Sequence, residues 1–86
     1  MDRDALTTLD PRKVAKSGLE VVDKLSDHPP AIQVHTLTVL FRLLVERHGL
    51  DVREELERTD RLIRDGDGNL KPEVGALRAY LHGEIK

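Results

Sequence analysis

The chain has 86 residues, of which 38% are apolar and 35% charged, with a net charge of −2. This length corresponds to a single domain, and the apolar content is too high for a disordered chain. The absence of cysteine excludes disulfides, thiolate zinc sites and thiol nucleophiles. The balanced charge argues against a strong general attraction to nucleic acid. Because so small a domain buries only about 60–65% of its unfolded surface, we expect self-association to add to its stability.

No segment of the chain resembles a targeting or membrane-spanning sequence. Residues 1–4 are acidic and polar, unlike the basic and then apolar start of a signal peptide. The longest apolar stretch, residues 39–45, is interrupted by Arg42 and is far too short to cross a bilayer. We therefore expect a cytoplasmic protein without membrane contact.

Capping residues and prolines divide the chain into four predicted helices. We expect them over about residues 11–25, 30–48, 52–64 and 71–83. Asp10 and Asp51 are suitable N-caps for the first and third helices, and the prolines after His28 separate the first helix from the second. The predicted fold is all-α, a small four-helix bundle around the apolar second helix. Residues 1–8 are expected to form a flexible N-terminal arm, and residues 9–86 a single helical domain.

The outer helices carry narrow apolar faces that we expect to be buried. In the first helix this face comprises Val14, Gly18, Val21, Val22 and Leu25. In the third helix it comprises Val52, Leu56, Thr59, Leu62 and Ile63. A glycine within a helix costs about 1 kcal/mol relative to alanine, so the close approach of another helix would explain Gly18. On the outer face of the third helix, acid–base spacing predicts the i,i+4 ion pairs Glu54–Arg58, Glu57–Arg61 and Asp60–Arg64.

The second helix is apolar around most of its circumference. Its polar side chains form one line, which comprises His35, Thr38, Arg42 and Glu46. Apolar side chains cover an arc of roughly 240° at 100° per residue. At its C-terminal end, Gly49 fits a left-handed C-cap and Leu50 can fold back on Val45, as in a Schellman motif. A helix this apolar must be covered on several sides.

Two arrangements would cover the second helix. The other three helices of one monomer can wrap it, or part of it can pair with another chain, most simply in a symmetric dimer. In either arrangement, the residues that we expect to make the decisive contacts are Leu37, Leu40, Phe41 and Leu44, with Arg42 and Glu46 at the rim. Core and interface look alike in sequence, so both arrangements stay open here.

The Asp-Gly-Asp-Gly-Asn sequence at residues 65–69 resembles the centre of an EF-hand calcium loop. In that register Ile63 occupies the first ligand position and Val74 the position of the bidentate glutamate, and neither has a ligand oxygen. We therefore interpret residues 65–69 as a turn that uses the tolerance of glycine, aspartate and asparagine for positive φ.

No motif predicts catalysis or cofactor binding. The four histidines lack the i,i+4 spacing of a helical metal pair, and the chain has neither a nucleophile-elbow serine nor a phosphate-binding lysine loop. We therefore expect a non-enzymatic protein with no catalytic residues, metal, cofactor or small-molecule substrate.

Nucleic-acid binding is the main alternative, because the second helix, the corner at residues 49–51 and the third helix resemble a helix-turn-helix in outline. The third helix would be the recognition helix. Its arginines are interleaved with glutamates and aspartates, however, and phosphate contacts require a basic or neutral surface. This pattern favours a solvated charged face over a DNA reader.

The run LFRLLVERHGLDVREEL at residues 40–56 resembles segments of small helical proteins encoded by bacteriophages and prophages. In those proteins an apolar helix ends at Arg-His-Gly or Arg-Tyr-Gly, and an aspartate-capped helix follows. The resemblance covers about a fifth of the chain. It implies a small regulatory or accessory factor that acts by protein contact. With the apolar second helix, it predicts a protein–protein interaction module that forms a homodimer or binds a protein partner.

Overall fold

Four α-helices make up most of residues 9–85, which are the residues that this computed structural model describes. They are α2 (Pro11–Leu25), α3 (Pro30–Arg47), α4 (Val52–Ile63) and α5 (Pro72–Glu84). The all-α prediction with four helices is confirmed, and the predicted ends agree with these bounds to within a residue. The predicted arm, residues 1–8, lies outside the described residues.

Aspartate side chains begin two of the helices, as the sequence predicts. Asp10 accepts a hydrogen bond from the Arg12 amide at 2.9 Å, and Asp51 accepts one from the Glu54 amide at 3.0 Å. The hydrogen bonds from the Arg12 amide and side chain also lower the pKa of the Asp10 carboxyl group. Each cap satisfies a backbone donor that has no partner within the first helical turn.

A Schellman motif ends α3. Gly49 has a φ of 65°, and its amide donates to the carbonyl oxygen of Glu46 at 3.1 Å. The Leu50 amide donates to the carbonyl oxygen of Val45 at 2.9 Å. These two bonds are the pair that defines the motif, so the predicted C-cap is confirmed.

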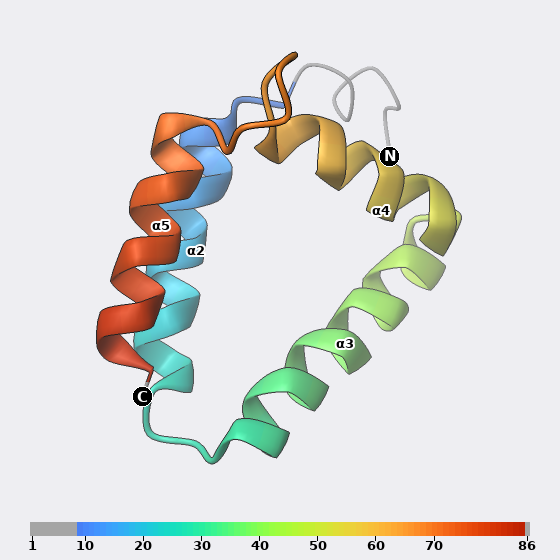
Figure 1. Cartoon of the computed structure of the whole chain (residues 1–86). Coiled ribbons are helices and arrows are strands. Elements are labelled where there is room, and N and C mark those ends of the chain that lie inside the picture. Colours follow the sequence, from blue (N-terminus) through green and yellow to red (C-terminus); the bar gives the residue numbers. More distant parts are fainter. Residues whose placement is uncertain (1–8, 86) are drawn as a thin grey trace.

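Helices α2 and α5 pack side by side and run in the same direction (Figure 1). The contact face of α2 includes Ala15, Val22 and Leu25, all of which are buried. Val14 and Val21, which the sequence placed on the same buried face, are 40% and 41% exposed. The difference arises because one helix, α5, covers α2, and a single neighbour covers a narrower face than a surrounding bundle would.

Gly18 lets α5 approach α2 closely. A Cβ atom built on Gly18 would lie 2.7 Å from Cδ2 of Leu77 in α5, which is inside van der Waals contact. The close helix approach that would explain a glycine at this position is therefore present. The rest of the α2–α5 contact is built around this point.

The helices α3 and α4 form the other sides of an open frame (Figure 1). The chain measures 35 × 31 × 18 Å, and its radius of gyration is 13.6 Å. A compact domain of this length would have a radius of gyration of about 12 Å. Helix α3 lies at the edge of the frame, which corrects the expectation that the helix at residues 30–48 is the centre of a bundle. The one extensive contact between helices joins α2 to α5. No helix packs extensively along α3 in the described part of the chain.

Helix α4 differs from its predicted burial pattern. Leu56 is 54% exposed, whereas Glu55 is buried. Arg58 donates from Nε to Glu55 at 3.2 Å, at i,i+3 spacing, instead of pairing with Glu54. The only other ion pair within 4.0 Å among residues 9–85 joins Arg12 and Asp10, so the predicted i,i+4 ladder is wrong. Exposed pairs are worth little in water, so partial shielding of Glu55 and Arg58 favours their pairing.

The close approach at Gly18 leads to a stability prediction that compares two glycine substitutions. Gly75→Ala in α5 should stabilise the fold by about 0.5–1 kcal/mol, because alanine favours helix and no atom lies within 4 Å of the new methyl group. Gly18→Ala should gain clearly less, because Leu77 must move. Urea unfolding followed by circular dichroism measures both, and equal gains would contradict close packing at Gly18.

Candidate interaction surfaces

Helix α3 exposes apolar side chains on more than one side. Those that are 44–57% exposed are Ile32, Val34, Leu37, Val39, Leu40, Leu43 and Leu44. Within α3, only Val45 is buried, and Phe41 is half-buried. A folded chain normally leaves single apolar residues at its surface, whereas larger exposed apolar patches are typical of interaction sites, ligand-binding grooves or aggregation-prone surfaces.

The exposed residues, with the half-buried Phe41, form two stripes that are centred roughly 130° apart around the helix axis. The main stripe comprises Val34, Leu37, Leu40, Phe41 and Leu44. The second stripe comprises Ile32, Thr36, Val39 and Leu43. Four of the six residues predicted to make decisive contacts lie on the main stripe. The second stripe was not singled out in the sequence, although its i, i+4, i+7, i+11 spacing is the signal that could have identified it.

Two residues of the main stripe, together with Thr36 of the second stripe, lie at the corner where α3 meets α2. Leu37 and Leu40 line a hollow of about 350 Å³ together with Val21 and Leu25 of α2. The hollow is apolar, and both leucines remain about half exposed beside it. The corner therefore brings apolar side chains near one another without covering them.

The predicted rim residues are exposed and do not pair with each other. Arg42 and Glu46 are both exposed and make no ion pair within 4.0 Å in the described part of the chain. His35, on the same polar line, is close to its own backbone, with Nδ1 2.8 Å from the Ala31 carbonyl oxygen. The charged side of α3 is thus free to solvent in the single chain.

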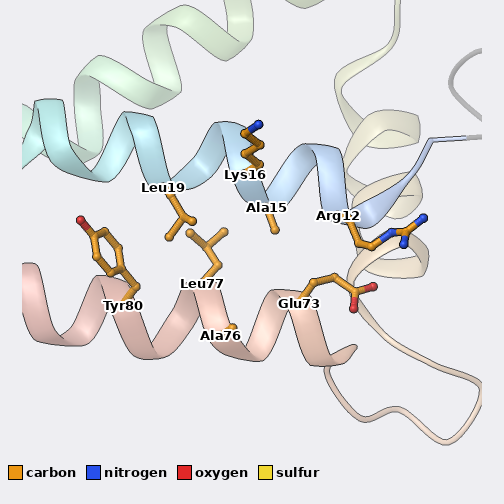
Figure 2. Close-up of a pocket in the computed structure, with 8 residues that line it drawn as sticks. All are labelled: Arg12, Ala15, Lys16, Leu19, Glu73, Ala76, Leu77 and Tyr80. Atoms are coloured by element: carbon orange, nitrogen blue, oxygen red, sulfur yellow. The ribbon is translucent and has the colours of Figure 1, made fainter.

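A groove with a volume of about 380 Å³ runs between α2 and α5 (Figure 2). Leu19 and Leu77 point toward one another across it, and Arg12 and Glu73 lie at one end. Its apolar floor belongs to the contact between the two helices. The groove is therefore mainly a consequence of how α2 and α5 pack against each other.

Tyr80 ties the other end of this groove together. Its hydroxyl donates a hydrogen bond to the carboxylate of Asp23 in α2. This bond, then desolvation and then the negative charge of Asp23 raise the pKa of Tyr80 to about 12. The phenol and the carboxylate are 57 residues apart in sequence, so their bond fixes how α5 lies on α2.

The loop at residues 65–69 is a closed turn. Oδ1 of Asp65 accepts hydrogen bonds from the amides of Asp67 and Asn69, at 2.9 and 3.0 Å. Gly68 has a φ of 81°, and its carbonyl oxygen accepts from Nη1 of Arg64 at 2.9 Å. The interpretation of this segment as a turn is confirmed. The Asp65 carboxylate is engaged by backbone donors of its own loop.

Helix α4 gives the helix-turn-helix alternative no added support. Arg58 is engaged by Glu55 in the same helix. The remaining arginines of α4 stand among acidic residues, as the sequence shows. Nucleic-acid binding stays a prediction.

Comparisons with protein families, with curated proteins and with solved structures find no match to this chain. The resemblance of residues 40–56 to phage-encoded proteins therefore stays a prediction. Among residues 9–85, no helix has both the length and the hydropathy that crossing a bilayer requires.

The Tyr80–Asp23 bond predicts a pH dependence of stability at high pH. The folded pKa of Tyr80, about 12, lies above its ordinary value of 10.0. The stabilisation is therefore fully present below pH 10 and is lost as the pH rises toward 12. Tyr80 is the only tyrosine and tryptophan is absent, so absorbance near 295 nm follows its ionisation alone.

We expect a titration midpoint near 12 in the folded chain and near 10 in denaturant. The Asp23→Asn variant should shift the folded midpoint back toward 10. A folded midpoint of 10 in the unmodified chain would show that the bond does not hold α5 on α2 in solution.

Proposed function

We propose that the protein is a non-enzymatic interaction module that acts by self-association, with α3 as its contact surface. The observation that carries the proposal is that seven apolar side chains of this one helix are 44–57% exposed. Burial of such side chains is the main driving force of folding and of association. A second copy of the chain is always present at the concentration of the first, and it supplies the same apolar surface.

The exposed area of the chain supports a partner of substantial size. The chain exposes 6752 Å², whereas a compact monomer of 9.7 kDa exposes about 5100 Å². The difference is roughly 1600 Å². Even half of it would equal the roughly 800 Å² that each partner contributes to a standard interface. A copy of this chain therefore has enough uncovered surface to form a stable dimer.

The stability of α3 supports the same proposal. An isolated helix of this length is marginal in water, and most helices in proteins are held by tertiary packing of an apolar face. In the described structure no helix packs extensively along α3. A partner that covers its side chains would supply the missing packing. The residues of the main stripe, with Arg42 and Glu46 beside it, are our proposed contact set.

From the sequence, we further propose that the protein is cytoplasmic and that it is similar to small phage-encoded proteins. A cytoplasmic protein that acts through contacts with other copies would need neither cysteine nor a cofactor. A regulatory or accessory role, as the phage-like segment implies, is compatible with such a module.

A pair of aspartate substitutions in α3 tests the proposal. Leu40 is 51% exposed, so in a stable monomer Leu40→Asp should change the free energy of unfolding by only about 0.5 kcal/mol. If a second copy covers Leu40, the buried charge should abolish association and most of the helical signal of α3. Circular dichroism with concentration-dependent melting measures both effects.

Thr38→Asp is the matched control, because Thr38 lies two positions away on the polar line of the same helix. We expect Thr38→Asp to keep the association and the melting temperature of the unmodified chain. Equal, small effects of both substitutions, with melting independent of concentration, would refute the self-association proposal.

A further inference from the structure

Of the second stripe of α3, only Thr36 lines the hollow at the corner with α2. Ile32, Val39 and Leu43 are 49%, 54% and 55% exposed. Unlike Leu37 and Leu40, they do not line the hollow shared with α2. If α3 turns its main stripe toward its own frame, the second stripe still faces outward. A partner that covers α3 completely must therefore also cover the second stripe.

A hollow of about 390 Å³ lies on the second stripe and is formed by α3 alone. It is lined by Ile32, His35, Thr36, Val39 and Leu40. The first four of these stand at positions i, i+3, i+4 and i+7. That set of positions forms the hole that receives one side chain, the knob, from a partner helix in knobs-into-holes packing. A side chain from another helix can therefore sit in this shallow hollow.

The hollow is largely apolar, so an apolar knob fits it. Ile32 and Val39 supply its two ends, and the small side chain of Thr36 leaves space between them. His35 already has its Nδ1 at 2.8 Å from the Ala31 carbonyl oxygen, so the side of its ring can line the hollow. No charged side chain lines it.

Leu43 is the one large apolar residue of the second stripe that does not line the hollow. In an antiparallel pair of α3 helices related by a two-fold axis, each Leu43 can enter the hollow of the other copy. The centre of the hollow lies between His35 and Thr36, so this pairing puts the axis next to Val39. Since α3 spans Pro30–Arg47, an axis at Val39 overlaps the two helices along nearly their whole length.

We infer that two copies pair through the second stripe, with α3 antiparallel to α3 and Leu43 of each copy seated in the hollow at Ile32, Thr36 and Val39 of the other. This inference rests on the proposed self-association and moves its seam from the main stripe to the second stripe. A two-fold interface of this kind uses the same patch on both copies, and it closes without leaving an open end. The main stripe then packs inward, toward the α2 corner and the partner's flanks.

Because the natural chain has no cysteine, single-cysteine variants can test the seam directly. Residues at the axis of an antiparallel helix pair bring their Cα atoms near the roughly 4.4–6.8 Å that a disulfide requires. The Val39→Cys variant should therefore form a covalent dimer on mild oxidation, and dilution before oxidation should reduce the yield. Thr38→Cys, one position away on the polar line, should stay monomeric on a non-reducing gel.

A third variant separates the two stripes. If Leu40→Cys forms a covalent dimer and Val39→Cys does not, the copies meet through the main stripe; the inference is then wrong and the proposed function stands. If the unmodified chain is monomeric at every concentration, both fail. A dimer by mass in which neither variant cross-links overturns the seam alone.

Substitution of the knob gives a second readout that needs no cross-link. Leu43→Ala keeps α3 helical and should raise the dimer dissociation constant roughly tenfold or more, because it empties the hollow on both copies. Thr38→Ala is its control and should leave the constant within about twofold. An unchanged dissociation constant for Leu43→Ala would contradict the proposed knob.

Discussion

The exposed apolar surface of α3 is the constraint on which the rest of the structure depends. Its eighteen residues carry apolar side chains on two stripes, and within residues 9–85 seven of these side chains remain 44–57% exposed. Full burial of an exposed leucine or valine contributes roughly 1.5–3 kcal/mol, so burial of the exposed half of each of these side chains contributes about half of that. For a domain whose net stability is only about 5–15 kcal/mol, several such residues decide whether the folded state is stable.

The pairing of α2 with α5 is the one extensive contact between helices in the described part of the chain. The Gly18–Leu77 contact and the Tyr80–Asp23 bond hold these two helices together, and both helices run in the same direction. A parallel pair needs a return connection, and α3 with α4 provides it. In this structure the return path runs around an open frame, and no helix packs extensively along α3 in the described part of the chain.

Local features could be read from the sequence because their causes are local. The cap at Asp51 and the Schellman motif at Gly49 depend on residues within one turn, and both are present as expected. Long-range features could not be read in this way. The exposure of Val21 and the burial of Glu55 depend on which helices become neighbours, and the apolar pattern of one helix does not specify its partner. The same holds for the surface of α3. The sequence predicts its apolar arc, but it does not show which parts of that arc the neighbouring helices leave exposed.

The most direct test of the account is the absolute mass of the chain in solution, measured by light scattering on a size-exclusion column over about a hundredfold range of concentration. The chain has a mass of 9.7 kDa. We predict a mass of twice this value at the higher concentrations, because the chain is then a dimer. The dimer should dissociate only on strong dilution. A mass of 9.7 kDa at every concentration, with all four helices intact by circular dichroism, would contradict it.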